Sequence, residues 1–205
     1  MTPAQHSSLR FYKYSVCGNN FVLVDEVQGT QLPESEKSVF ARIAADEYFG
    51  IGCDSILFLQ RYSTDLLHSI NDCRKYWNSC PTEFESDIDF VFRIFEPNGT
   101  ESMCCGNGLL STAHLLNSHY GLSRATILTE IPSAEPRARQ VGSLESNGAC
   151  QVNMGCPTAF PDRLLTKQVL EKQINHLNIV DGLTIAFQVK GLDRPVHAFH
   201  LKCYG

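Results

Sequence analysis

A run with two cysteines and two glycines, Met103-Cys104-Cys105-Gly106-Asn107-Gly108, leads directly into an apolar helical pattern. Leucine and alanine recur there mostly at three- and four-residue spacing over 109–120, and Gly121 is placed to end the helix. Cys105 would then lie at the helix entrance, where unpaired N–H groups and the positive end of the helix dipole stabilise a thiolate. The pattern therefore predicts a thiol that can act as a base.

The small residues after Cys105 suit the binding of an anion. The backbone N–H groups of Gly106, Asn107 and Gly108 could hold a carboxylate, because glycines let a ligand approach the backbone closely. A carboxylate bound beside a thiolate points to chemistry at the α-carbon of an amino acid. The alternative is a glycine-containing turn before a core helix, with Cys105 as a small buried hydrophobic residue. The motif alone leaves both interpretations open.

Composition and charge restrict the classes of function. The chain has 205 residues, of which 43% are hydrophobic and 19% charged, enough to bury one or two modest cores. A net charge of −5 without a basic run argues against nucleic-acid binding. The sequence shows no stretch of 18 apolar residues and no apolar signal core near its start, so we expect a cytoplasmic protein without a membrane partner.

The nine cysteines do not form the pattern of a disulfide scaffold. Their number is odd, the chain is long, and their spacing gives no paired C-x-x-C motif, which favours free thiols in a reducing compartment. Cys73 and Cys80 flank a tryptophan-containing stretch without a nearby pair of histidines. We therefore expect no metal site.

Periodicity and turn residues predict the elements that must position these groups. The expected strands cover two parts of 11–26 joined by a Gly18-Asn19-Asn20 turn, 56–59, 89–95, 125–129, 149–154 and 183–189, with a hydrophilic connection between 129 and 149. Besides the helix over 109–120, helices are expected over 35–48, with Ser35 as a possible N-cap, and over 167–177. The polar segment 61–87 is interpreted as a surface insertion, with a helical lid as the alternative.

Three further segments precede Cys105 in a fixed order: FYKYSVCGNNFVLVD at 11–25, GIGCDS at 50–55 and FRIFEPNGTE at 92–101. With the Cys105 motif they resemble the diaminopimelate epimerase family, the amino-acid racemases and epimerases that work without pyridoxal phosphate. The resemblance is dense from about residue 11 to 121. It is thinner afterwards, where it rests on VNMGCP at 152–157 and on PVH at 195–197.

The resemblance implies an α+β fold of two similar lobes, each with a curved sheet around a central helix, and an active site between the lobes. Each lobe of such an enzyme contributes one cysteine from a helix entrance. One thiolate removes the α-proton while the opposite thiol delivers another, which inverts the stereocentre. The resemblance also implies an amino-acid substrate, no cofactor, and a role in amino-acid metabolism such as lysine biosynthesis.

The family's second cysteine motif, and the acidic-plus-arginine pair before it, have no counterpart up to Gly205. We therefore expect an N-terminal lobe over 1–123, with an insertion at 61–87, and an incomplete second lobe over 124–205. The expected consequence is that the chain alone does not racemise an amino acid at an enzyme-like rate unless another chain, as in a possible homo-oligomer, supplies the opposite acid. A catalytically silent or truncated homologue acting as a binding protein, and another isomerase on the same fold, are the alternatives.

The resemblance places Asn19, Ser55 and Glu96 in the substrate pocket beside Cys105. Ser55 stands where the family usually has a glutamine, and Glu96 stands where it has an asparagine. A carboxylate prefers a cation to the mixed partners of an amide, so Glu96 would suit a basic side chain such as that of histidine, ornithine or lysine. The alternatives are a turn role for Asn19 and a solvated loop position for Glu96.

We assign no catalytic role to four other residues near these motifs: Cys104, His114, Asn153 and His197. Cys104 lies outside the aligned position, and His114 is one turn into the helix, where a packed residue is expected. His197 lacks the neighbouring asparagine that family members carry.

Overall fold

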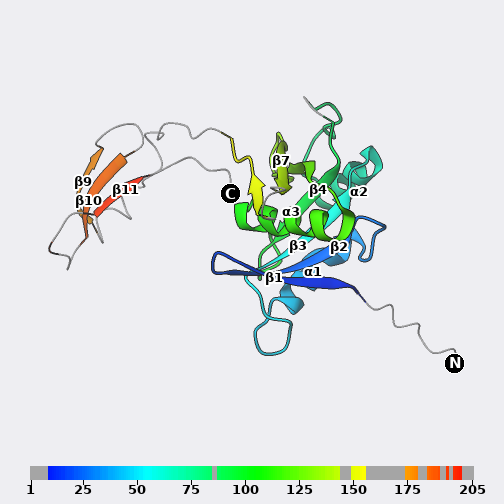
Figure 1. Ribbon diagram of the computed structural model, residues 1–205, viewed down its shortest axis with the longest axis horizontal. Helices are drawn as coiled ribbons and strands as arrows, with labels where there is room; N and C mark the ends of the chain where they lie inside the picture. The colour runs from blue at the N-terminus through cyan, green and yellow to red at the C-terminus, as the bar shows by residue number, and fades with distance from the viewer. Residues whose placement is uncertain are drawn as a thin grey trace. The chain divides into compact units, whose positions relative to one another are not determined.

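The computed structural model describes residues 9–84, 87–143, 149–155, 174–179, 184–189, 193 and 196–199. These residues belong to two compact units that divide after Met154 (Figure 1). The first unit contains all the residues predicted for the site. Among the described residues, no helix is both long enough and apolar enough to cross a membrane.

The first unit is built on one sheet. Its strands are β1 (Phe11–Val16), β2 (Asn19–Glu26), β3 (Ser55–Arg61), β4 (Phe90–Phe95), β5 (Glu101–Ser102), β6 (Arg124–Thr129), β7 (Arg137–Ser143) and β8 (Cys150–Val152). The order is β1-β2-β3-β4-β6-β7-β8, with β5 paired to β4. The pairs β2/β3 and β4/β6 are parallel, and the other pairs are antiparallel.

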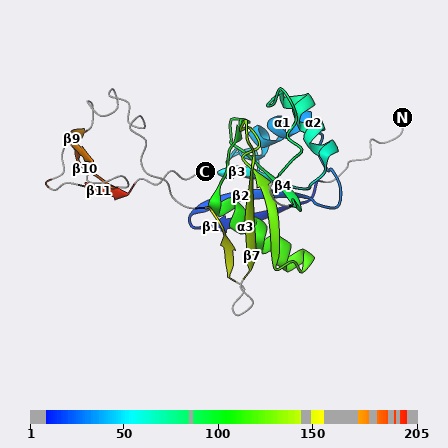
Figure 2. The same ribbon diagram turned by 90° about the horizontal axis from the view of Figure 1, so that it is seen from above.

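Helix α3 (Gly106–Tyr120) lies against one face of this sheet. It contacts β1 and β2 near one end of the strand order and β7 and β8 at the other end, so the sheet must curve around the helix (Figures 1 and 2). The predicted fold class, α+β with a curved sheet around a central helix, is confirmed. The helix ends at Gly121, whose φ of +67° is the left-handed conformation that glycine adopts at low cost.

Alternation along the strands decides which side chains meet α3. The core on this face combines strand residues with one stripe of the helix: Phe21, Leu23, Leu57, Leu59, Phe92, Ile94, Leu109, Ala113 and Leu116. The opposite face is covered by α1 (Glu34–Ala44) and α2 (Thr64–Arg74). The curved sheet therefore carries helices on both faces, with α3 on the face lined by Phe21, Leu57 and Phe92.

The predicted hairpin over 11–26 is present, and its turn lies slightly earlier than expected. Cys17 and Gly18 both have positive φ, +49° and +91°, as in the two-residue turns that match the twist of paired strands. Asn19 and Asn20 already belong to β2. Their backbones are therefore part of the sheet, and Asn19 is not simply a turn residue.

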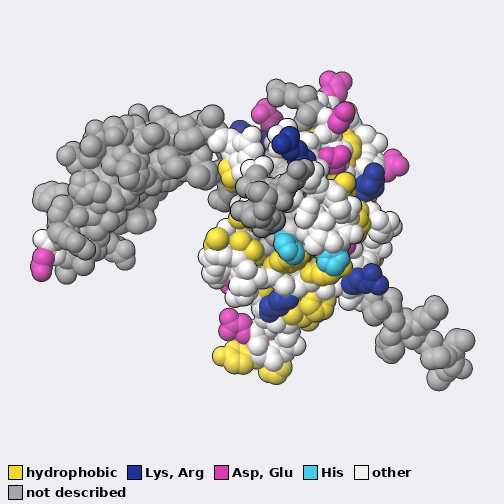
Figure 3. All heavy atoms as spheres, viewed as in Figure 1, with side chains coloured by type: hydrophobic (Ala, Val, Ile, Leu, Met, Phe, Trp, Pro, Cys, Tyr) yellow, Lys and Arg dark blue, Asp and Glu magenta, His cyan; other side chains and the backbone are white. Residues whose placement is uncertain are grey.

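Both predicted boundaries of the helix expected over 35–48 were wrong. Helix α1 begins at Glu34 after Pro33, so Ser35 is not its N-cap, and it ends at Ala44, because the chain then turns into a loop. Tyr48 lies in that loop and is 87% exposed. Phe49 beside it is 93% exposed. Figure 3 shows in yellow the hydrophobic side chains that reach the surface on one face of the molecule.

The predicted hydrophilic connection before 149 contains a strand that the sequence analysis missed, β7 (Arg137–Ser143). Its partners β6 and β8 supply the hydrogen bonds that hold this polar sequence extended. In the segment 61–87, Leu67, Ile70 and Trp77 are buried against Val91 and Leu128. Whether this segment is an insertion relative to other proteins stays a prediction, as does the domain boundary after residue 123.

The second unit contains the antiparallel strands β9 (Ile174–Ile179), β10 (Thr184–Val189) and β11 (Val196–Phe199). Strand β10 confirms the strand predicted over 183–189. The helix predicted over 167–177 is wrong at 174–177, where the chain pairs with β10, and the rest of that prediction lies outside the described residues.

Charged side chains are buried on the face of β4 opposite α3. Arg93 is fully buried, donates to both carboxylate oxygens of Glu101 at 2.7 and 2.6 Å, and pairs with Glu34. Lys37 pairs with Glu26 and, at 3.2 Å, with Glu34. Burial alone would raise the pKa of Glu34, but the charges of Arg93 and Lys37 outweigh it and lower that pKa.

Candidate functional site

Cys105 is the N-cap residue of α3. Its backbone is extended, with φ −142° and ψ 114°, and its Sγ accepts a hydrogen bond from the N–H of Gly108 at 3.4 Å. The helix begins at Gly106, three residues before the predicted start, because the glycines adopt the helical conformation. The half-buried thiol thus occupies the place that a serine or aspartate usually takes at a helix N-terminus.

The loop that carries Cys105 is fixed by contacts with the end of β6. The carbonyl of Met103 accepts from the N–H of Glu130 at 2.8 Å and from the hydroxyl of Thr129 at 3.4 Å. Glu130 is buried, has a φ of +59°, and pairs with Arg139 at 2.9 Å. Arg139 also donates to the carbonyl of Met154 at 3.1 Å. These contacts of Glu130 and Arg139 were not predicted, because a single sequence does not show which charges pair.

The first turn of α3 has two backbone donors that bond to no other described residue. Among the described residues, the N–H groups of Gly106 and Asn107 form no hydrogen bond, whereas the N–H of Gly108 is used by Cys105. A Cβ at Gly106 would lie 3.7 Å from the Sδ of Met154, an ordinary contact. The entrance to the helix can therefore accept an anion at two donors.

Gly108 has a packing role that its sequence motif does not indicate. A Cβ at this position would lie 2.9 Å from the Cζ of Phe92 and 3.3 Å from a methyl group of Leu57. The absence of a side chain lets the helix lie close to β3 and β4. This packing explains Gly108 without a ligand.

Asn107 and Asn19 connect the helix to the sheet. The amide of Asn107 donates to Oδ1 of Asn19 at 2.8 Å, and the amide of Asn19 donates to Oδ2 of Asp54 at 3.4 Å. The same oxygen of Asp54 accepts from the N–H of Asn20 at 2.7 Å. The start of β2, the residue before β3 and the first turn of α3 are thereby held together.

Glu96 is bound by two hydroxyl groups. Ser102 donates to its Oε1 at 2.6 Å and Ser55 to its Oε2 at 3.4 Å. Ser55 is buried and Glu96 is half-buried. The alternative of a freely solvated loop glutamate therefore does not describe this side chain.

Strand alternation places these polar groups on the α3 face of the sheet. Asn19 is two residues before Phe21, Ser55 two before Leu57, and Glu96 two after Ile94; all three hydrophobic residues pack on the α3 side. With Ser102, Cys105 and Asn107 they form what we call the polar row. It lies at the edge of the core next to the N-terminus of α3.

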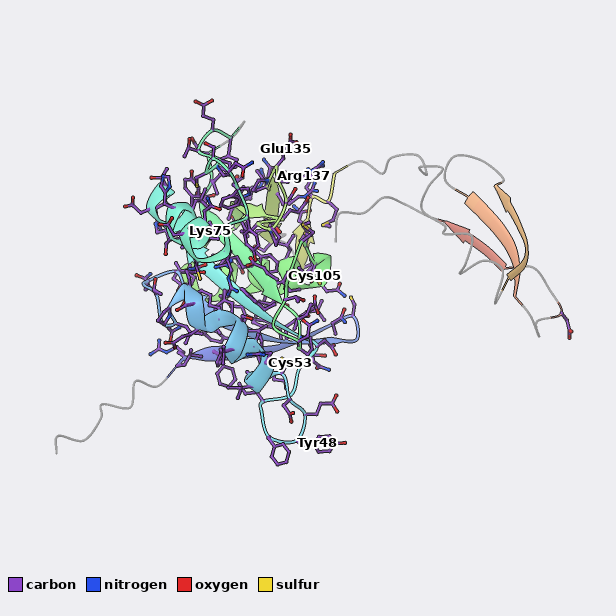
Figure 4. The ribbon with its side chains drawn as sticks, turned by 180° about the vertical axis from the view of Figure 1, so that it is seen from behind. Tyr48, Cys53, Lys75, Cys105, Glu135 and Arg137 are labelled. Atoms are coloured by element: carbon purple, nitrogen blue, oxygen red, sulfur yellow. The ribbon has the colours of Figure 1, made fainter. Side chains whose placement is uncertain are left out.

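The structure thus brings together the residues predicted for the site, although their roles stay predictions. Asp54 and Ser102 were not singled out, but Asp54 lies within the GIGCDS segment and Ser102 within the run that leads to Cys105. Figure 4 shows Cys105 at the start of α3, whereas Tyr48 lies at the tip of the loop after α1.

Of the four residues expected to have no catalytic role, Cys104, His114 and Asn153 lie in the first unit and His197 in the second. Cys104 is buried, and burial raises the pKa of its thiol. His114 is exposed and its Nδ1 lies 3.2 Å from the hydroxyl of Tyr14. Asn153 follows β8, and His197 lies in β11 of the other unit.

A metal site has no support from the described part of the chain. There, no three or more histidine, cysteine, aspartate or glutamate side chains are grouped so that they could hold an ion. The expectation that the protein uses neither a metal nor a cofactor stays a prediction.

Comparison with known proteins found relatives by sequence. No protein-family model matches the chain. It is 35% identical over 124 residues to the diaminopimelate epimerase of Methanothrix thermoacetophila, an alignment that covers 60% of this chain and 36% of that protein. It is 28% identical over 189 residues to the diaminopimelate epimerase of Aromatoleum aromaticum, covering 92% and 57%, and 29% identical over 153 residues to that of Nitrosospira multiformis, covering 75% and 45%.

These alignments leave much of each relative uncovered, since the chain spans about half the length of the curated relatives it matches. Among solved structures, a Bacillus anthracis phenazine biosynthesis protein of the PhzF family is similar at a TM-score of 0.44 and 21% identity. That alignment covers 89% of this chain and 52% of the other.

Proposed function

We propose that this chain, a relative of the diaminopimelate epimerases, carries the thiol that acts on one face of the α-carbon in an amino-acid epimerase or racemase site. The observation that supports this proposal is the first turn of α3. There the thiol of Cys105 caps a helix whose next two N–H groups, those of Gly106 and Asn107, have no partner among the described residues.

An amino-acid carboxylate that accepts hydrogen bonds from these two N–H groups would bring its α-carbon next to Cys105. The thiolate removes the α-proton, and the negative charge that develops towards the carboxylate is stabilised by the same donors and by the helix dipole. This stabilisation takes the place of a cofactor that would otherwise accept the charge. Inversion further requires an acid on the opposite face of the α-carbon.

The polar row supplies the remaining contacts in this proposal. The side chain of Asn107 is held by Asn19. The two N–H groups of Gly106 and Asn107, which we call the carboxylate cradle, therefore keep their geometry before the substrate binds. Asn19 is itself bound to Asp54, which extends the support to β3. Preorganisation of this kind lowers the cost of ordering the site on binding.

Exchange of the α-hydrogen in deuterated water tests the proposal. The chain is incubated with a panel of L-amino acids, and the loss of the α-proton signal is followed by NMR. Cys105→Ala and Cys105→Ser should lower the exchange rate by about 100-fold or more, because the base is deleted or replaced by a far weaker acid. The exposed Cys73 provides the control: Cys73→Ser should leave the rate unchanged.

Two outcomes would contradict the proposal. Exchange that persists in both Cys105 variants would remove this thiol from the mechanism. Binding of amino acids without any exchange would identify a binding protein instead of an enzyme.

A further inference from the structure

We infer that Glu96 makes this site selective for an amino acid whose side chain ends in a cation, an ammonium or a guanidinium group. The inference rests on the proposed function, since it takes the first turn of α3 as the place of the substrate carboxylate. It adds the substrate class, which the thiol and the helix entrance leave open.

The position of Glu96 is the first step. It follows the last residue of β4, Phe95, and its carboxylate is held by Ser55 of β3 and Ser102 of β5. Ser102 is three residues before Cys105, and Ser55 directly follows Asp54, which is bound to Asn19. Glu96 is therefore connected to the helix entrance by two paths, one through Ser102 and the other through Ser55, Asp54 and Asn19.

The charge of Glu96 is the second step. The carboxylates of Glu26, Glu34, Glu101 and Glu130 are buried, and each forms an ion pair with a lysine or arginine. Glu96 is half-buried, and no lysine or arginine of the described residues pairs with it. Its side-chain partners in the described part of the chain are neutral hydroxyl groups, and no cation there compensates its negative charge.

The distance from the first turn of α3 to Glu96 is the third step. The first turn of α3 contacts the start of β2, because Asn107 donates to Asn19, and Glu96 directly follows β4. Neighbouring strands lie about 4.8 Å apart, so β2 and β4 are separated by roughly 10 Å across β3. An amino acid whose carboxylate lies on the first turn of α3 would need an extended side chain to reach Glu96. Lysine, ornithine and arginine have such side chains, and each ends in donors that a carboxylate binds with charge assistance.

The same charge disfavours a side chain that ends in a carboxylate. Glu96 would repel such a group, whereas an asparagine or glutamine in its place could donate a hydrogen bond to it. The structure therefore points to a substrate different in charge from a dicarboxylic amino acid.

Titration calorimetry with three ligands tests the inference: L-lysine, L-norleucine, which has the same carbon chain without the ammonium group, and L-2-aminoadipate, which ends in a carboxylate. The wild-type chain should bind lysine at least about 10-fold more tightly than norleucine. Glu96→Gln should abolish this preference, so that lysine binds no more tightly than norleucine. Glu96→Asn should also strengthen binding of 2-aminoadipate.

Glu135 provides the matched control. It is exposed and lies away from Cys105 in Figure 4, and its substitution removes the same charge from the protein. Glu135→Gln should keep the preference for lysine. A preference lost equally in the Glu96 and Glu135 variants would reflect only net charge and would overturn the inference.

The α-hydrogen exchange assay, run on the same samples, separates this inference from the proposed function. If the α-hydrogen exchanges but lysine and norleucine bind with equal affinity, the role of Glu96 is overturned and the proton-transfer function stands. A Glu96-dependent preference for lysine without exchange would support the cation subsite and reject the enzymatic function. Failure of all three ligands to bind would overturn both.

Discussion

The side-chain amide of Asn107 donates a 2.8 Å hydrogen bond to Oδ1 of Asn19, a residue 88 positions earlier in the chain. Asn107 lies in the first turn of α3 next to Cys105, and Asn19 is the first residue of β2. This contact joins the helix entrance to the start of β2. It also joins two residues that the sequence motifs indicate separately.

The first prediction concerns the strength of that contact. Asn19→Ala and Asn107→Ala should each destabilise the fold, and in a double-mutant cycle the two changes should couple by about 1 kcal/mol. Urea unfolding of the single and double variants measures the coupling. Asn117 lies on the same helix and has no side-chain hydrogen bond among the described residues, so Asn19→Ala with Asn117→Ala should be additive. Additivity in the Asn19/Asn107 pair would show that the contact is not formed in solution.

The second prediction separates a glycine needed for packing from one available to a ligand. Gly108→Ala should destabilise the fold by roughly 1–3 kcal/mol, because its Cβ would lie 2.9 Å from Phe92. Gly106→Ala should cost little stability, since the nearest atom to its Cβ is 3.7 Å away on Met154. It should nevertheless weaken amino-acid binding, because the added methyl group occupies the approach to the cradle. Chemical unfolding measures both effects on stability. Equal free energies of unfolding for Gly108→Ala and Gly106→Ala would contradict the packing of α3 on β4.

The third prediction tests the buried charges behind β4. Arg93→Met should destabilise the protein by about 3–5 kcal/mol, because it leaves Glu34 and Glu101 buried without their main cation. In contrast, Lys75 and Asp72 pair at 3.9 Å with side chains that are 76% and 85% exposed. Lys75→Met should therefore change the unfolding midpoint very little. A small effect at Arg93 would mean that water or a rearrangement compensates these carboxylates.

The sequence predicted the parts of the fold that local patterns determine. The hairpin over 11–26, the strands that became β3 and β4, and the end of α3 at Gly121 each follow from alternation, helical spacing or a turn residue. These signals lie within a few residues of one another in the chain. The thiol at the helix entrance could be placed for the same reason.

Features that depend on distant partners could not be predicted. Strand β7 is polar and is held extended by its neighbours, so its own sequence gives little indication of a strand. The burial of Trp77 depends on Val91 and Leu128, and the burial of Arg93 depends on Glu34. For the site, family resemblance suggested Asn19, Ser55 and Glu96, but only the structure shows that Asn19 accepts from Asn107 and that Ser55 donates to Glu96.

The fourth prediction concerns pH. Burial, followed by the nearby Tyr12, Cys150 and Asp25, raises the pKa of Tyr14 from 10.0 to about 12. The folded state therefore favours the protonated phenol, so its stabilising contribution is complete below pH 10 and is lost as the pH rises towards 12. Between pH 10 and 12, the urea midpoint of the wild type should fall relative to that of Tyr14→Phe. A difference that does not change with pH would contradict the burial of Tyr14 against α3.

The most direct test of the proposed site is the response of the α3 entrance to an amino acid. In a two-dimensional NMR titration of the 15N-labelled chain with L-lysine, the backbone amides of Gly106 and Asn107 should shift progressively and saturate. The amide of Glu135, which lies away from Cys105, should not move. Shifts confined to other parts of the chain, or no shift of the first turn of α3 at saturating lysine, would contradict the account.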